Sequence, residues 1–158
     1  MAYIVIILVI IMAISPVIWM RPSPRQKQLV RLREHAAKMH MQVSIRTLPP
    51  RLQRRHDNPT MTCYLTNHPR NKQADTDKPR PLWYVSVVDA GFEWIGKPDL
   101  MIQEALQRLC ATLPKGCCYL EAEQGFVGVY WLEQGTEERV DKIASIISEV
   151  MKLQNEQR

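Results

Sequence analysis

Four cysteines and four histidines are the side chains of this 158-residue chain that could hold a metal ion or act as nucleophile and base. Cys117 and Cys118 are adjacent, so in a strand they would point to opposite faces of a sheet. No C-x-x-C or H-x-x-x-H pair supplies two ligands at the spacing of a zinc site. We therefore expect no metal site and interpret the cysteines as buried thiols. A cysteine nucleophile whose histidine lies far along the chain is the alternative that the sequence leaves open.

The six glycines lie apart from one another and form neither G-x-x-x-x-G-K nor G-x-G-x-x-G, the two patterns that hold nucleotide phosphates. No histidine has a second group at a spacing that would position it as a general base. The sequence therefore predicts no cofactor, no catalytic residue and no enzymatic activity.

Positive charge is concentrated in the first half of the chain, although the formal net charge is only +5. Residues 21–60 contain ten lysines and arginines against two acids, whereas residues 82–158 contain seven against twelve. Basic residues beside a membrane fix the orientation of the protein in that membrane, and they can also attract anionic lipid. Both roles stay open here. With nucleic acid as the less favoured ligand, we predict anionic contacts at five positions: Arg21, Arg25, Lys27, Arg31 and Arg33.

The stretch from residue 89 to residue 96 combines turn residues with two acids and two aromatic side chains, Phe92 and Trp94. We predict a loop here. Its rings either close the end of a sheet or bind a protein partner, because aromatic side chains often dominate interfaces. The sequence does not decide between these two interpretations.

Hydrophobic periodicity predicts a single α+β domain over residues 42–155. Its helices are expected to begin at Pro98 and after Thr136, because proline favours the first helical position and threonine caps free N–H groups. Each helix would bury one apolar face against a sheet. Alternation of apolar and polar residues predicts strands in residues 42–47, 61–66 and the two arms of 117–133. A run of aromatic and β-branched residues predicts another strand in residues 82–88.

Three further segments complete the predicted organisation. Ser23 and Pro24 favour the start of a basic helix within residues 22–41, beside the membrane. The segments 48–60 and 68–81 are polar and rich in proline, so they have little to bury and are expected to be mobile loops.

The hairpin in residues 117–133 allows a prediction of strand register. If Glu123 faces Phe126 across the turn, three pairs of nearly apolar residues share one face of the two strands. We expect this face to be the buried side of the sheet. The predicted pairs are Ala122 with Val127, Leu120 with Val129, and Cys118 with Trp131.

Residues 3–20 contain no charged side chain and are almost all aliphatic. Eighteen helical residues rise about 27 Å, close to the roughly 30 Å of hydrocarbon that a transmembrane helix must cross. We predict a transmembrane anchor over residues 1–21, with the basic residues that follow it held on the cytoplasmic side. The amino terminus would then lie outside and the domain in the cytoplasm, in a single-pass membrane protein.

Two segments carry a resemblance to a known group of proteins. Residues 15–26 read SPVIWMRPSPRQ, and residues 130–135 read YWLEQG. Both resemble a family of small bacterial inner-membrane proteins that have one N-terminal span and a cytosolic domain. The resemblance implies the bacterial inner membrane as the location, and it implies no activity and no site residues.

Together these features predict an α+β fold: one N-terminal transmembrane helix, then a mainly antiparallel sheet of about five strands covered by two amphipathic helices. The leading functional hypothesis is a non-enzymatic accessory or scaffold protein that presents its domain to a protein partner. The alternative is a module that binds anionic lipid or nucleic acid through the basic segment after the anchor.

Overall fold

The structure, a computed structural model, describes residues 3–7, 10, 12, 22–53, 58–67, 83–88, 91–96, 98, 100–123 and 125–156. The chain divides into two compact units, Met1–Arg31 and Leu32–Arg158. Their boundary lies within the first labelled helix, α2 (Pro24–Lys38).

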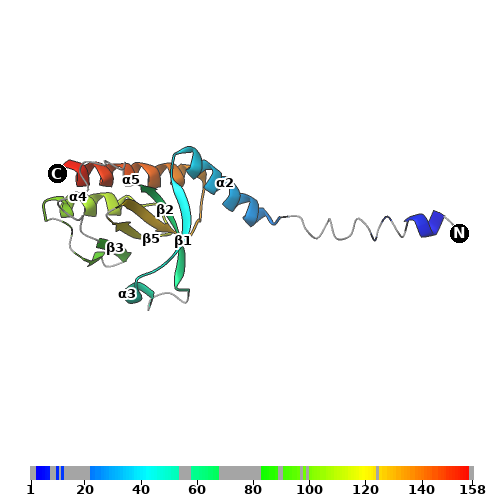
Figure 1. The fold of residues 1–158 in the computed structure, drawn as a ribbon, viewed down its shortest axis with the longest axis horizontal. Helices are drawn as coiled ribbons and strands as arrows, with labels where there is room; N and C mark the ends of the chain where they lie inside the picture. Colours follow the sequence, from blue (N-terminus) through cyan, green and yellow to red (C-terminus); the bar gives the residue numbers. More distant parts are fainter. Residues whose placement is uncertain are drawn as a thin grey trace. The chain divides into compact units, whose positions relative to one another are not determined.

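The second unit is built on a six-stranded antiparallel sheet with the strand order β1-β2-β6-β5-β3-β4 (Figure 1). Its strands are β1 (Gln42–Thr47), β2 (Thr60–Asn67), β3 (Trp83–Val88), β4 (Gly91–Ile95), β5 (Cys117–Ala122) and β6 (Phe126–Trp131). Its helices are α3 (Pro50–Gln53), α4 (Leu100–Ala111) and α5 (Glu137–Glu156).

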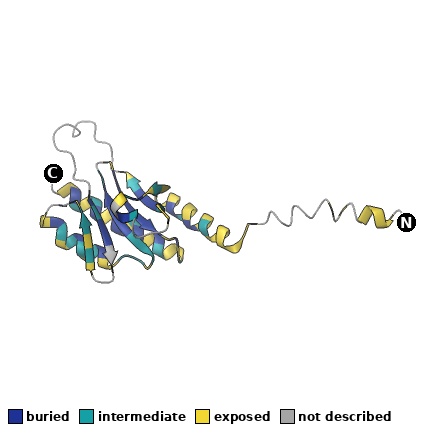
Figure 2. Cartoon of the chain, turned by 90° about the horizontal axis from the view of Figure 1, so that it is seen from below, coloured by how far each residue is buried: buried dark blue, intermediate teal, exposed yellow. Residues whose placement is uncertain are grey.

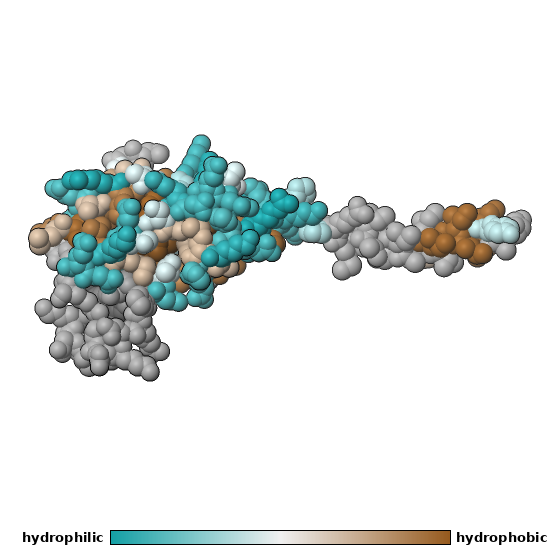
Figure 3. Space-filling view, turned by 90° about the horizontal axis from the view of Figure 1, so that it is seen from above, coloured by the Kyte–Doolittle hydropathy of each residue, from teal (hydrophilic) through white to brown (hydrophobic). Residues whose placement is uncertain are grey.

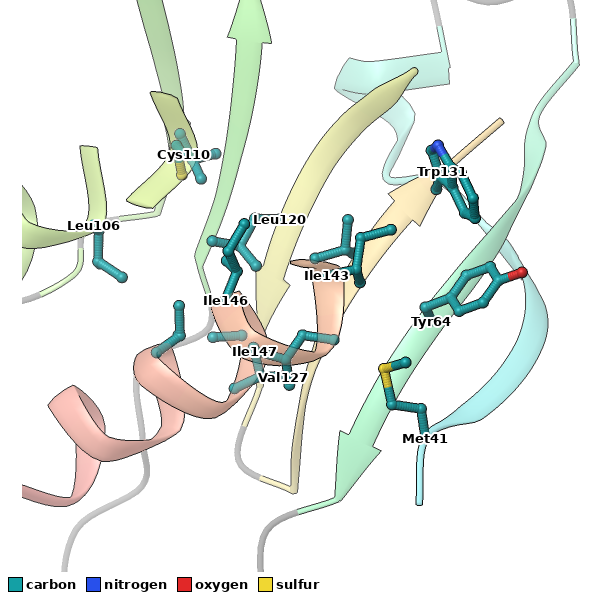
Figure 4. Close-up of a cluster of buried hydrophobic side chains, with 14 of the residues drawn as sticks. Met41, Tyr64, Leu106, Cys110, Leu120, Val127, Trp131, Ile143, Ile146 and Ile147 are labelled. Atoms are coloured by element: carbon teal, nitrogen blue, oxygen red, sulfur yellow. The ribbon is translucent and has the colours of Figure 1, made fainter. Parts of the chain in front are cut away.

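The larger hydrophobic core lies between one face of the sheet and the helices α4 and α5. Figure 4 shows three isoleucines of α5 pointing toward the hairpin strands. Every one of these side chains is at most 2 % exposed, and full burial of such a side chain stabilises the fold by roughly 1.5–3 kcal/mol. The contact set is Ile143, Ile146 and Ile147 with Leu120 and Val127.

A second, smaller core lies on the opposite face of the sheet. Leu52 of α3 packs there with Leu48 and with side chains of the central strands. All six residues of β6 are buried as a result, and Figure 2 shows buried residues gathered in the middle of the sheet. The sheet is therefore covered on both faces near its centre, whereas the sequence pattern predicted one buried side.

The hairpin confirms most of the predicted register. The Glu123 N–H donates to the Phe126 carbonyl at 3.0 Å, and Ala122 pairs with Val127 and Leu120 with Val129. The predicted pairing of Cys118 with Trp131 is wrong, because the register shifts between Cys117 and Tyr119 and Cys117 takes the position opposite Trp131. One extra residue in β5 produces this β-bulge, which a regular alternation pattern does not predict.

The predicted transmembrane helix is contradicted. Of residues 3–20, the structure describes 3–7, 10 and 12. Among all described residues, none of the helices has both the length and the apolar character that a membrane crossing requires. The predicted fold class is therefore wrong in this respect. The predicted location, a single-pass protein of the bacterial inner membrane with its domain in the cytoplasm, is contradicted by the same finding.

The helix predicted within residues 22–41 is α2, and its first turn is capped as expected. The Gln26 N–H donates to Ser23 Oγ at 3.2 Å, and the Ser23 N–H donates to Gln26 Oε1 at 2.8 Å. This reciprocal pair is a capping box, with Pro24 at the first helical position.

The predicted loops differ from the structure in two places. The segment 48–60 contains the short helix α3, and its residues 54–57 lie outside the described residues, as does the whole segment 68–81. The segment 89–96 contains the strand β4, which pairs with β3 and is the sixth strand of the sheet. The alternation of Phe92, Glu93 and Trp94 suits an edge strand, but its turn residues favoured a loop.

Candidate functional site

Four of the five basic positions predicted to contact an anionic ligand belong to the described residues, and Arg21 lies outside them. Arg25, Lys27 and Arg31 are exposed on α2, in the first unit. For these three residues the anionic contact stays a prediction. Arg33 differs from them because it forms an ion pair inside the second unit.

The partner of Arg33 is Glu133, a carboxylate two residues after the end of β6 that is only 5 % exposed. Arg33 donates from Nε to Oε1 at 2.8 Å and from Nη2 to Oε2 at 2.7 Å. The hydroxyl of Tyr64 donates to Oε1 at 3.0 Å, and that of Thr62 donates to Oε2 at 3.2 Å. The carboxylate thus accepts four hydrogen bonds, which is about its full capacity, so it has little left for a substrate.

These contacts also fix the protonation of the network. Burial alone would raise the pKa of Glu133, but the hydrogen bonds from Arg33, Tyr64 and Thr62 and the Arg33 charge outweigh it and hold the pKa below its ordinary value. Burial and the adjacent Glu133 carboxylate raise the pKa of the Tyr64 hydroxyl. At neutral pH the network is therefore a charged acceptor surrounded by donors, and its arrangement does not favour proton transfer.

A second buried carboxylate, Glu121, lies on the other face of the sheet and is 1 % exposed. The Tyr130 hydroxyl donates to its Oε2 atom at 2.6 Å. Burial, followed by the interaction with Glu121, raises the pKa of both Tyr130 and Tyr84. Both tyrosines are thus neutral at physiological pH, and the hydrogen bond from Tyr130 satisfies a buried polar group, as a stable core requires.

The thiols are held in their protonated form. Burial raises the pKa of Cys63, Cys110 and Cys117 to about 12, and burial also raises that of Cys118. A nucleophilic cysteine needs a lowered pKa, so these surroundings suit structural thiols. In the part of the chain that the structure describes, no group of three or more His, Cys, Asp or Glu side chains is placed to hold a metal ion.

Phe92 and Trp94, predicted to lie in a partner loop, are half-buried residues of β4. Both pack against the larger core, and the Trp94 ring meets the Trp83 ring edge-on with centroids 5.7 Å apart. This packing fits the interpretation in which the aromatic residues close the sheet. A role in binding a partner stays a prediction.

A depression of about 260 Å³ lies beside Glu133, at one end of the sheet. Its polar lining includes Asn58, Thr60 and Thr62, and Leu132, which is 47 % exposed, adds an apolar wall. Next to this depression, the edge strand β1 places Ile45 opposite Thr62 in the register, and the Ile45 side chain is 69 % exposed. We call the outer edge of β1 together with Ile45 the edge surface.

Sequence reasoning identified neither Glu133 nor the edge surface as special. Glu133 was the last residue of a predicted strand, and its partner Arg33 was grouped with exposed basic residues. The positive φ of Glu133, 54°, is also invisible in a sequence. Ile45 fitted the apolar side of a half-buried strand. Its exposure depends on where the helices stop covering the sheet.

Searches among protein families, curated proteins and solved structures find no match to this chain. The resemblance at residues 15–26 and 130–135 is therefore neither supported nor contradicted by a relative.

Proposed function

We propose that this chain is a non-catalytic protein-interaction domain, and that the edge surface pairs with an extended segment of a partner protein. One observation carries the proposal: an isoleucine side chain, Ile45, is 69 % exposed in the middle of an edge strand. Among the described residues, β1 pairs only with β2, so its outer backbone groups face away from the sheet.

The exposed positions of β1 are Gln42, Ile45 and Thr47, so an apolar side chain lies exposed between two polar ones. Natural sheets usually protect their edges against pairing with other chains. The opposite edge of this sheet has such protection. The exposed positions of β4 are Gly91, which has no side chain, and Glu93, which is charged. The aromatic rings of β4 pack against the larger core. The exposed Ile45 in the middle of β1 supports a use for that edge in recognition by strand addition.

The chemistry of the buried groups supports a role without catalysis. The two buried carboxylates, Glu121 and Glu133, accept hydrogen bonds from tyrosines and from Arg33. The cysteines have raised pKa values. Groups of this kind hold a fold together, whereas a catalytic group needs an exposed face and a pKa near the working pH.

The edge surface suggests the chemistry of the partner. A strand added beside β1 would place its own side chains next to those of β1 at alternating positions. The residue beside Ile45 should be aliphatic or β-branched, because it would bury apolar area on both sides of the contact. Polar residues suit the neighbouring positions, where β1 has Ser44 and Arg46.

The proposal is tested by selecting random displayed peptides on the full-length chain and measuring their affinity by fluorescence anisotropy. The selected peptides should share an alternating apolar pattern, and they should slow the exchange of the β1 amides. Replacing Ile45 with Lys should weaken binding by tenfold or more, which corresponds to about 1.4 kcal/mol.

A matched control is Leu100→Lys, which introduces the same charge at an 81 % exposed apolar position on α4. This variant should bind the selected peptides with unchanged affinity. Peptides that share no pattern, or that bind the Ile45→Lys variant as tightly as the original chain, would show that the edge surface is not a recognition site.

A further inference from the structure

The depression beside Glu133 lies where β2 and β6 separate. Their pairing ends at Cys63 of β2, and the depression lies between the two segments that continue beyond it. Thr62 is on the face of the sheet that the helices cover, because it lies two residues from Tyr64, which packs in the larger core. Figure 3 views the side of the second unit on which α5 lies, where hydrophilic side chains surround smaller apolar patches. Ile45 is opposite Thr62 and shares its face, so the depression adjoins the edge surface.

The threonine hydroxyls that line this depression have already donated their hydrogens. The Thr62 hydroxyl must be the donor to Glu133, because an ionised carboxylate can only accept. The Thr60 hydroxyl donates to Asn58 Oδ1 at 2.9 Å. The Thr60 N–H donates to the same atom at 3.1 Å, which confirms that this atom accepts. The two threonine oxygens therefore have only lone pairs left, and a ligand between them must be a hydrogen-bond donor.

The charge at the depression is negative. Glu133 is the only charged side chain among the described residues that line it, and Arg33 is not part of the lining. The carboxylate end of the ion pair therefore faces the depression and attracts a cation, while the threonine oxygens accept its hydrogen bonds. Leu132 and Trp131 add apolar surface, and the Trp131 N–H is already bonded to the Lys115 carbonyl at 3.3 Å. This combination suits an ammonium group at the end of an aliphatic chain.

We infer that the depression binds a lysine side chain of the partner segment that adds to β1. The inference rests on the proposed function and specifies one residue of the partner. Thr47 is opposite Thr60, so a partner residue beside Thr47 can lie on the face of the depression. Two strand spacings separate such a residue from β2, about 10 Å in total. The four-carbon stem of a lysine and one hydrogen bond span most of this distance, across the small and exposed Thr47 side chain.

No cation of β1 competes for this position. Arg46 lies between Ile45 and Thr47, but its guanidinium is 4.3 Å from the centre of the Phe126 ring. That ring belongs to the smaller core, on the opposite face of the sheet. The partner should therefore have an aliphatic residue beside Ile45 and a lysine two positions away, beside Thr47, because residues two apart in a strand share a face.

The test compares a selected peptide with two synthetic versions of it, each binding to the full-length chain in the anisotropy assay. Norleucine in place of the lysine keeps most of the aliphatic stem without the charge, and glutamine keeps hydrogen-bond donors without the charge. Each replacement should weaken binding at least tenfold. Selected peptides that have no lysine at this position, or equal affinity of the lysine and norleucine versions, would overturn the inference.

The Thr60→Val variant tests the same contact from the protein side, because it removes a hydroxyl and nearly keeps the side-chain shape. It should bind the lysine peptide about tenfold more weakly and the norleucine version with unchanged affinity. The matched control, Thr66→Val, makes the same change at the other end of β2 and should bind both peptides as the original chain does. Equal losses for both peptides in Thr60→Val would show that the hydroxyl does not contact the ammonium group.

The outcomes separate this inference from the proposed function. Peptides whose binding depends on Ile45, but on neither the lysine nor Thr60, would overturn the ammonium site and leave the edge surface as a recognition site. Peptides whose binding does not depend on Ile45 would overturn both.

Discussion

Arg33 and Glu133 are separated by 100 positions in the sequence, yet they form a two-point ion pair with distances of 2.8 and 2.7 Å. The pair connects the end of α2 that belongs to the second unit with Glu133, the second residue after β6. Tyr64 and Thr62 of β2 donate to the same carboxylate. One acidic side chain thus holds a helix, a strand and the exit of the hairpin together.

Replacing Glu133 with Gln should destabilise the domain, because an amide nitrogen would face donors that now meet a carboxylate oxygen. We expect the free energy of unfolding to fall by about 2 kcal/mol, less than for a fully buried pair because the Arg33 side chain is 42 % exposed. Urea unfolding followed by circular dichroism measures the change. As the control, Glu104→Gln removes an exposed pair and should cost below about 0.5 kcal/mol.

The contribution of Glu133 should depend on pH in a defined direction. Its pKa in the folded state lies below its ordinary value of 4.5, so the unfolded chain binds the proton more readily. The stabilisation is fully present above pH 4.5 and is lost as the pH falls through the lower, folded value. Melting temperatures of the original chain and of Glu133→Gln should therefore differ at pH 7 and converge in acid. A constant difference down to pH 2 would contradict this assignment.

Much of the local structure was predictable from sequence because its determinants are local. Ser23, Pro24 and Gln26 specify a helix start within four residues, and the structure shows that capping box. In the hairpin, the alternation of apolar residues predicted two pairs correctly. It failed at Cys118, because a bulge depends on how neighbouring strands bend and leaves no local signature.

The candidate site depends on long-range packing, and this is why sequence reasoning missed it. Nothing near Arg33 distinguishes it from the exposed Arg31, and only the folded chain brings Glu133 within reach. Ile45 and Val43 follow the same alternating pattern. Val43 is half-buried against the larger core, whereas Ile45 lies beyond its cover.

Gly128 should tolerate no side chain, because a Cβ atom there would lie 2.7 Å from Cys63 Sγ and 3.3 Å from Leu65 Cβ. We expect Gly128→Ala to lower the free energy of unfolding by about 1–3 kcal/mol, through overpacking between β6 and β2. Thermal unfolding of the original chain and of the Gly128→Ala variant measures this loss of stability. Gly125→Ala is the control, since no atom lies within 4 Å of its added methyl. Adding Cys63→Ala to Gly128→Ala should recover part of the loss; if it does not, the sulfur is not the obstacle.

Thiol reactivity tests the alternative of a cysteine nucleophile directly. At pH 8 a thiol with a pKa of about 12 is ionised in roughly one molecule in 10,000, near a thousandfold less than a thiol with the ordinary value of 9.0. Native Cys63, Cys110 and Cys117 should therefore react with iodoacetamide far more slowly than the same residues in the unfolded chain. Of the four thiols, Cys118 should react first, because it is the least buried.

Mass spectrometry of peptides after timed alkylation measures each site separately, with the urea-unfolded chain as the reference. Uniformly slow labelling would agree with structural thiols and with a domain that acts by binding. A single cysteine that labels faster in the native chain than in the unfolded chain would have a lowered pKa in the fold. Burial alone raises the pKa of a thiol and slows its reaction, so that result would show that burial does not control the pKa of this cysteine. It would favour a cysteine nucleophile over a domain that acts by binding.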